Sequence, residues 1–275
     1  MPELPETETI ARGLDRALSG TMVVDVAVHR ADVLREVTAA SLSRRAVGAR
    51  IERSYRRAKA VVIVLDSGDK LVVQPRFTGA LLIDDGSLPA ESLRYVAVSF
   101  ALDDGRMLAY RDVRRLGTLA LMSPRRFAKF DAALGPEPLD PAFTARHLSG
   151  ILRDSRQAVK KLLMDQRKIA GVGNIYANEA LWRAGIDPSR ASHSIDDEGA
   201  RGLYRELTAV LREAIEARGT SFRDYRDASG ARGGFSGRLT VYGRGGLPCP
   251  SCGAALIETS AIDGRTTVFC AWCQR

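Results

Sequence analysis

The pattern of apolar and polar positions changes along the chain from a short helical stripe to β-rich segments and then to longer helices. Near the N-terminus, Ile10, Leu14 and Leu18 recur every four residues, and Gly20 follows them. This spacing predicts an amphipathic helix over residues 7–18 that ends before the glycine. The first residues, MPELPE, are therefore attached to an element that packs on a core.

Residues 22–122 contain short apolar segments separated by turn sequences. The segments are MVVDVAVHR, AVVIVLD, KLVVQ, YVAVSFAL, RMLAY and LGTLALM, and the turns include DSGD and DDG. Too few helices can lie between such segments for a parallel sheet. The pattern therefore predicts a sandwich or barrel-like β domain.

A stretch with three prolines, LGPEPLDPAF at 134–143, predicts a linker, and the helical period dominates beyond it. Helical spacing occurs over 155–166, 173–184 and 196–218. The segment 219–238 is rich in glycine, serine and charge, without sustained periodicity, and predicts a mobile loop. We expect an N-terminal domain over 1–133, a helical domain over 144–238 and a C-terminal module over 239–275.

Charge and hydropathy narrow the class of protein. The chain has 41 Lys and Arg against 33 Asp and Glu, a net charge of +8 and a pI near 9.6, which suits an anionic partner such as nucleic acid. Charge alone is weak evidence, since many basic proteins bind nothing acidic. The sequence has no run of eighteen apolar residues, and its N-terminus is acidic where a signal peptide would be basic. We expect a cytoplasmic protein without membrane contact.

All four cysteines lie near the C-terminus in two closely spaced pairs, Cys249-x2-Cys252 and Cys270-x2-Cys273. Two tight turns with this spacing present four thiolates tetrahedrally to Zn²⁺. A four-thiolate site leaves no open coordination position, so one structural zinc ion should fold a hairpin and should not activate water.

Other motifs of metal or nucleotide chemistry are missing from the sequence. His29, His147 and His193 are scattered and match neither a helical zinc-protease motif nor a deaminase signature. The fragment Gly171-Val172-Gly173 lacks the third glycine of a dinucleotide loop. We therefore expect no nucleotide cofactor.

If the initiator methionine is removed, Pro2 carries a secondary amine at the N-terminus. An α-amino group has a pKa of roughly 8, so much of it is neutral and nucleophilic near pH 7. Such an amine can attack a carbonyl-level carbon and form an iminium, and the adjacent Glu3 could move protons. By itself, however, the sequence Met-Pro-Glu is more typical of an ordinary N-terminus.

Several further motifs are spread along the chain. They are the N-terminal PELPETET, the hairpin sequence Arg56-Arg57-Ala58-Lys59, the segment Tyr110 to Gly117, the block LMDQRKIAGVGNIYANEAL at 163–181, and Arg265-Thr266-Thr267 before the third cysteine. In combination they resemble the bacterial formamidopyrimidine-DNA glycosylases, over essentially the whole chain. The resemblance implies an α+β fold with two domains: an N-terminal β-sandwich with flanking helices, and a helical domain with a helix-two-turn-helix element and a zinc-finger β-hairpin.

The resemblance implies a chemical role for four residues. Pro2 would form a Schiff base at C1′ of the damaged nucleotide, and Glu3 would donate and accept protons at the sugar. Lys59 would assist β-elimination, and Arg265 would contact phosphate and assist δ-elimination. Lys59 or Arg265 taken alone would be interpreted as a solvated surface cation.

The resemblance also implies contacts to DNA. Arg156, Lys160 and Asn174 would hold phosphates, with the small residues around Asn174 allowing close approach. The loop 219–238 would cover the lesion.

A flipped base leaves a gap in the stack that side chains must fill. The corresponding wedge residues here are Phe77, Arg114 and Leu116. Phe77 stands where the family usually has methionine, and Leu116 stands where it has phenylalanine. An aromatic wedge can still stack, so flipping should survive, but the preference for the opposite base is put in doubt.

The resemblance thus implies a monomeric base-excision repair enzyme of the bacterial cytoplasm and nucleoid. Its partner would be double-stranded DNA with a damaged base or an abasic site, and its substrates oxidised purines such as 8-oxoguanine and formamidopyrimidines. One alternative is an endonuclease VIII-like activity on oxidised pyrimidines, although that branch usually begins P-E-G-P. Another is a noncatalytic protein that senses DNA damage.

Overall fold

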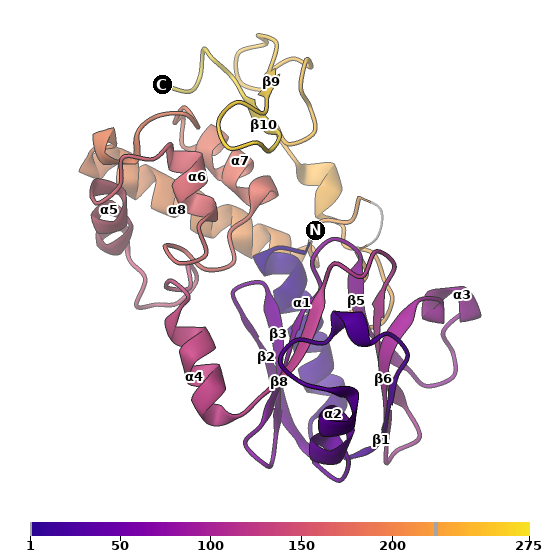
Figure 1. Cartoon of the computed structure of the whole chain (residues 1–275). Coiled ribbons are helices and arrows are strands. Elements are labelled where there is room, and N and C mark those ends of the chain that lie inside the picture. Colours follow the sequence, from indigo (N-terminus) through magenta and orange to yellow (C-terminus); the bar gives the residue numbers. More distant parts are fainter. Residues whose placement is uncertain (1, 223–224) are drawn as a thin grey trace. The chain divides into compact units, whose positions relative to one another are not determined.

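The computed structural model describes residues 2–222 and 225–275, and the chain divides into two compact units. The first unit consists of Met1–Ala132 and Ile215–Ser236, and the second of Ala133–Ala214 and Gly237–Arg275. Each unit has its own secondary structure and core, so each is described by itself (Figure 1).

The first unit is built on two four-stranded antiparallel sheets (Figure 1). One sheet has the order β1 (Val23–Val28), β6 (Val96–Leu102), β7 (Met107–Asp112) and β5 (Gly79–Asp84). The other has the order β2 (Ile51–Arg57), β3 (Ala60–Leu65), β4 (Lys70–Gln74) and β8 (Thr118–Met122). A single apolar cluster contains inward-facing residues of both sheets, such as Ile63 and Phe100. The prediction of a β-sandwich is confirmed.

Helices flank these sheets. They are α1 (Leu4–Leu18), α2 (Ala39–Ala46), α3 (Ala90–Leu93), α4 (Pro124–Ala132) and the short 3₁₀ helix η1 (Ala31–Val33). Helix α1 packs on β2 and β3, and its stripe of Ile10, Leu14 and Leu18 is completely buried. The helix begins three residues earlier than the apolar spacing predicts, because Glu3 and Glu6 form a capping box at its start.

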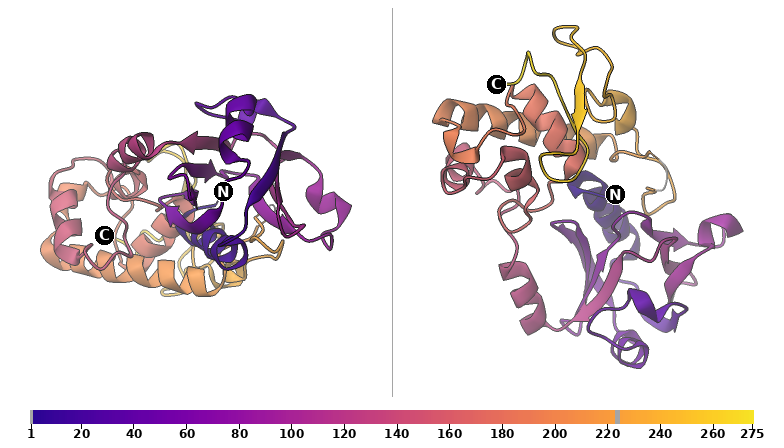
Figure 2. Two further views of the ribbon diagram at one scale, coloured as in Figure 1. Left: turned by 90° about the horizontal axis from the view of Figure 1, so that it is seen from below. Right: turned by 45° about the horizontal axis from the view of Figure 1, so that its top comes forward.

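The second unit is helical, with a small hairpin near the C-terminus (Figure 2, yellow). Its elements are α5 (Ala145–Arg153), α6 (Val159–Met164), α7 (Asn174–Arg183), η2 (Ser192–Ser194), most of α8 (Asp197–Glu216), part of η3 (Phe235–Arg238), and the antiparallel pair β9 (Ile257–Thr259) and β10 (Thr267–Phe269). The prediction of a helical domain with a cysteine-bearing hairpin is confirmed.

The helix expected over 155–166 is shorter than its periodicity suggests. Ala158 pairs with Ala191 in an isolated antiparallel bridge, so the backbone before α6 is extended and the helix begins only at Val159. Asp165 ends it. Local periodicity did not predict this start, because the start depends on the pairing with Ala191, more than thirty residues away.

The proline-rich stretch 134–143 lies within the second unit and is packed. The Gly135 N–H donates to the Gln166 carbonyl at 2.8 Å, and the Ala170 N–H donates to the Pro136 carbonyl at 2.9 Å. Phe143 is buried. The segment 219–238, which we expected in the helical domain, belongs to the first unit up to Ser236; its residues 223–224 lie outside the described part of the chain.

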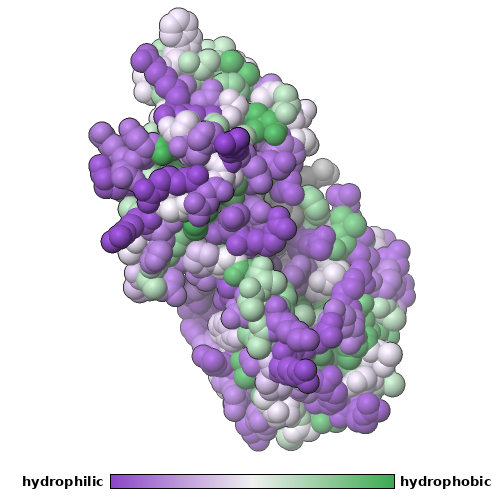
Figure 3. Space-filling model, turned by 60° about the vertical axis from the view of Figure 1, so that its left-hand side comes forward, coloured by the Kyte–Doolittle hydropathy of each residue, from purple (hydrophilic) through white to green (hydrophobic). Residues whose placement is uncertain are grey.

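Polar side chains cover much of the face shown in Figure 3, with small apolar patches among them. Within the described residues, no helix is long and apolar enough to cross a membrane.

Candidate functional site

The N-terminal residues of the first unit are held by the capping box of α1. Pro2 and Glu3 are buried, and the Glu3 N–H donates to Glu6 Oε2 at 2.8 Å. The other carboxylate oxygen of Glu6 accepts the Thr220 N–H at 2.7 Å. Tyr225 O–H donates to the Glu6 carbonyl at 3.3 Å. One glutamate therefore fixes both the backbone next to Pro2 and the start of the 219–238 loop.

The close approach of this loop requires a glycine. Gly219 has a φ of +81°, and a Cβ there would lie 2.9 Å from Glu6 Oε1. The loop also lies close to α1 at Ala228, since a Cβ at Gly13 of α1 would lie 3.0 Å from the Cβ of Ala228. The Ala228 carbonyl accepts the Ile83 N–H of β5 at 3.0 Å. The described loop residues are thus fastened to α1 and to the sheet.

Lys59 lies in the tight turn between β2 and β3, and is half-buried. Ala58 precedes it with a φ of 52° and is buried. The guanidinium of Arg56 donates to Glu8 of α1 at 2.8 Å and also to the Ala58 carbonyl at 3.1 Å. Helix α1 therefore orients the turn of Lys59 through Glu8, as it orients Glu3 through Glu6.

The three predicted wedge residues lie on two neighbouring loops of the first unit. Phe77 is 50% exposed and Leu116 is 40% exposed. The Arg114 guanidinium lies 5.7 Å from the centroid of the Phe77 ring. The structure thus brings an aromatic, an aliphatic and a cationic side chain to the surface.

A buried carboxylate joins the two wedge loops. Asp112 is 1% exposed and accepts hydrogen bonds from the Thr78 hydroxyl at 2.5 Å and the Gly117 N–H at 2.7 Å. The Thr78 oxygen in turn accepts the Arg114 N–H at 3.0 Å. Burial and the charge of Asp112 raise the pKa of Tyr110, so its hydroxyl stays protonated and donates to Asp112 at 3.4 Å.

In the second unit, the glycine-rich turn before α7 is braced by Gln166. Its side-chain amide donates to the Val172 carbonyl at 2.9 Å and accepts the Gly171 N–H at 2.8 Å. Asn174 is the first residue of α7, so the turn leads directly into a helix N-terminus. The Asn174 side chain donates to the Thr266 carbonyl, beside Arg265, at 2.9 Å.

Lys160 differs from its expected role as a phosphate contact. It is 0% exposed, and its ammonium donates to the Thr267 hydroxyl at 2.7 Å and the Thr266 carbonyl at 3.2 Å. It also pairs with Asp263 at 3.4 Å. Asp263 accepts the Arg265 N–H at 2.9 Å. Lys160 therefore supports the loop that carries the exposed Arg265, from inside the protein.

Arg156 is exposed in the segment between α5 and α6. The structure thus assembles the predicted residues in two groups. Pro2, Glu3, Lys59 and the wedge residues belong to the first unit, and Lys160, Asn174 and Arg265 are linked within the second.

The four cysteines come together and could hold a metal ion, their sulfur atoms lying within 4.8 Å of one another. Cys249 and Cys273 are 3.9 Å apart, and Cys252 and Cys270 are 3.5 Å apart. Four sulfurs bound tetrahedrally at Zn–S distances of about 2.3 Å would be separated by roughly 3.8 Å. The donor set therefore fits a thiolate-bound metal.

Comparison with known proteins identifies the family. The N-terminal domain of formamidopyrimidine-DNA glycosylases matches residues 1–119, and their H2TH domain matches residues 134–226. The formamidopyrimidine-DNA glycosylase of Xanthomonas campestris pv. campestris is 42% identical over 100% of both chains, and that of Chloroflexus aggregans is 41% identical over 100% of this chain and 98% of its own. The chain belongs to the formamidopyrimidine-DNA glycosylase family.

Solved structures of the family have the same fold. The MutM (Fpg) protein of Thermus thermophilus matches with a TM-score of 0.87 and 38% identity, over 99% of this chain and 98% of that one. Lactococcus lactis Fpg in complex with abasic-site DNA matches with a TM-score of 0.90 and 29% identity, over 99% of both chains. The resemblance inferred from the motifs is confirmed.

Sequence reasoning missed the structural role of three acidic residues. Glu6 accepts the Glu3 N–H, Asp112 accepts the Gly117 N–H next to Leu116, and Asp263 accepts the Arg265 N–H. The spacing Glu3-x-x-Glu6 is a signal that could have been used, because a capping box has that period. Asp112 lies in the motif segment Tyr110 to Gly117, which did not indicate this role, and Asp263 has no comparable local signal.

Proposed function

We propose that this chain is a bifunctional DNA glycosylase and abasic-site lyase of base excision repair that acts as a monomer on damaged duplex DNA in the bacterial cytoplasm. The observation that carries the proposal is the clamp at the N-terminus, where Glu6 holds the backbone beside Pro2 in a buried place. Membership of the family supports the same activity.

The first step uses the amine of Pro2 after removal of Met1. Its nitrogen attacks C1′ of the damaged nucleotide, the N–C1′ bond forms, and the bond to the base breaks. The base leaves with the electron pair and takes a proton. Glu3 then protonates O4′ as the C1′–O4′ bond opens, which yields the iminium. Burial of Glu3 places its carboxyl group out of bulk water.

The iminium makes two eliminations possible. Loss of a proton from C2′ expels the 3′ phosphate, and later loss of a proton from C4′ expels the 5′ phosphate, which leaves a one-nucleotide gap. Lys59 assists the first elimination, and Arg265 binds phosphate and assists the second. Arg156 and Asn174 contribute further phosphate contacts, and Phe77, Arg114 and Leu116 fill the gap left by the flipped base.

The metal in the cysteine cluster is a structural Zn²⁺, since four thiolates match its preferred donors and leave no position for substrate. The ion stabilises the hairpin that presents Arg265.

Borohydride trapping tests the proposed function. The purified protein, with Met1 removal verified by mass spectrometry, is incubated with duplexes carrying 8-oxoguanine opposite cytosine or an abasic site. A covalent adduct on both duplexes, mapped by mass spectrometry to the Pro2 nitrogen, supports the amine mechanism on an oxidised purine. Binding without adduct or strand cleavage on either duplex would instead identify a damage-sensing DNA-binding protein.

Oxidised pyrimidines are a second candidate class of substrate. Lactococcus lactis Fpg has been solved in complex with DNA containing an oxidised pyrimidine, and it matches this chain with a TM-score of 0.90 and 28% identity. The exposed Phe77 and Leu116 depart from the family's usual wedge. Adducts on a duplex with an oxidised pyrimidine and on the abasic duplex, but not with 8-oxoguanine, would favour this specificity.

A further inference from the structure

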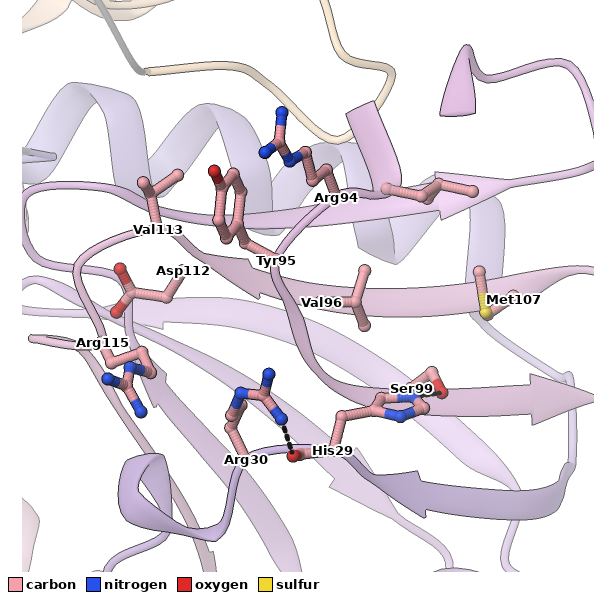
Figure 4. Close-up of a pocket in the computed structure, with 11 residues that line it drawn as sticks. His29, Arg30, Arg94, Tyr95, Val96, Ser99, Met107, Asp112, Val113 and Arg115 are labelled. Carbon is pink, nitrogen blue, oxygen red and sulfur yellow. Dashed lines mark hydrogen bonds between the residues drawn. The ribbon is translucent and has the colours of Figure 1, made fainter. Parts of the chain in front are cut away.

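The first unit carries an open groove beside the wedge loops, with a volume of about 1110 Å³. It is lined from the end of β1, from the segment leading into β6, and from β7 with the loop after it (Figure 4). In this view, Arg94 and Tyr95 lie above Val96, and Arg30 and Arg115 lie below it. Arg115 belongs to the motif segment Tyr110 to Gly117, whereas Arg30 and Arg94 lie outside the family motifs.

The groove has an excess of positive charge at its surface. Arg30, Arg94 and Arg115 are exposed, and His29 lies beside Arg30. The acidic residue among the lining residues is Asp112, which is 1% exposed, and both of its carboxylate oxygens accept hydrogen bonds from the protein. Its charge is therefore directed into the loops and away from a ligand.

Two of these arginines have exposed acidic neighbours. Arg115 pairs with Asp32 at 2.8 Å, and Arg94 pairs with Glu91 at 3.6 Å. All four side chains of these pairs are at least half exposed. Ion pairs between exposed side chains contribute little free energy of stabilisation. A phosphate can therefore replace the carboxylate at small cost in free energy.

Aromatic surface accompanies the charge. Tyr95 is 47% exposed, and the Arg94 guanidinium lies 5.0 Å from its ring centroid. Tyr95 has a φ of 70°, which is uncommon for a residue other than glycine. The Tyr95 carbonyl accepts the Asp112 N–H at 3.1 Å. Arginines beside an exposed ring are a combination that suits a nucleic-acid strand.

The groove is continuous with the wedge through one loop. In the segment after β7, Val113 and Arg115 line the groove, whereas Arg114 and Leu116 are wedge residues. A duplex whose gap is filled by Leu116 therefore passes within reach of Arg115 and the groove.

We propose that this groove binds backbone phosphates of the lesion-containing duplex on one side of the flipped nucleotide, with Arg30 and Arg94 as the main contacts. The inference rests on the proposed function, and it adds a phosphate-binding surface to it.

The test compares Arg30→Ala/Arg94→Ala with the control Arg44→Ala/Arg125→Ala. The control removes two exposed arginines of the same unit, on α2 and α4, that do not line the groove. The dissociation constant for a duplex with a noncleavable tetrahydrofuran abasic analogue is measured at several KCl concentrations. The log-log slope of the groove variant should fall by about 1.8, since each lost phosphate contact removes about 0.9. A fall no larger than that of the control would overturn the proposal.

Duplexes shortened on either side of the analogue provide a second measurement. Trimming the arm that reaches the groove should abolish the difference between the unmodified protein and the groove variant, whereas trimming the other arm should preserve it. A difference that survives both truncations would also overturn the proposal. Borohydride trapping of the unmodified protein on abasic DNA is measured separately, and its failure would refute the proposed function.

Discussion

Lys160 carries a fully buried charge, and its closest anionic partner, Asp263, is nearly as deeply buried. We predict that Lys160→Met lowers the free energy of unfolding of the second unit by about 3 kcal/mol, because breaking a buried ion pair leaves a charge without compensation. Urea titration monitored by circular dichroism would measure this loss.

Lys160→Met/Asp263→Asn is the matched variant for this prediction. It removes both charges but keeps an oxygen at position 263 that can accept the Arg265 N–H. It should therefore be more stable than the single variant. If the double variant is the less stable of the two, the pair is not the source of the effect.

The role of Lys160 also shows why single residues are hard to interpret from sequence. The family resemblance implied a phosphate contact, which requires an exposed ammonium, and most lysines are exposed. Its partners Asp263 and Thr267 lie 103 and 107 positions away. By contrast, the paired cysteines were predictable because metal-ligand spacing is local within each pair.

Among the elements, most strands were predicted from their apolar segments, including the edge strands β1 and β8, whereas β2 and β5 were missed. β3 and β4 are central in their sheet and were recognised from AVVIVLD and KLVVQ. β2, with the sequence IERSYRR, was absent from the predicted segments because most of its residues are polar. β5, with the sequence GALLID, was also absent, although residues 80–83 form an apolar run.

The first turn of α1 links the N-terminus to the 219–238 loop, and this supports a prediction about Glu6. In Glu6→Gln, one carboxylate oxygen becomes an amide donor, so it cannot accept both the Glu3 and Thr220 N–H groups. We expect adduct formation on abasic DNA to slow about tenfold, equivalent to about 1.4 kcal/mol, because the amine of Pro2 is less well positioned.

Single-turnover borohydride trapping at saturating DNA measures this rate. Glu52→Gln is the control, since it makes the same chemical change at an exposed position of β2. Equal adduct rates in the two variants would mean that Glu6 caps the helix without positioning the nucleophile.

At the scale of the whole molecule, the cysteine-bearing hairpin has a small apolar core of its own within the second unit, and the proposed metal would stabilise it. The finger core contains Val241, Leu256 and Val268 together with Cys249 and Cys270, and no residue of the first unit's large core belongs to it. Because a structural zinc site contributes its binding energy to folding, removal of the metal should unfold this small core. The sandwich should remain folded.

The effect of metal removal should extend into α6. Three polar partners of Lys160, namely Asp263, Thr266 and Thr267, lie in the finger hairpin. When the hairpin unfolds, the lysine loses these contacts, and burial of its charge becomes unfavourable. Hydrogen exchange of the chelated protein should therefore show lost protection in β9, β10 and α6, with protection retained in β3.

A chromophoric chelator would count the zinc released in the same sample, with one ion per chain expected. Loss of protection confined to β9 and β10 would show that α6 is held by its own packing and that Lys160 does not transmit the unfolding. Loss of protection in β3 as well would mean that the two cores unfold together, in which case the metal stabilises the whole chain.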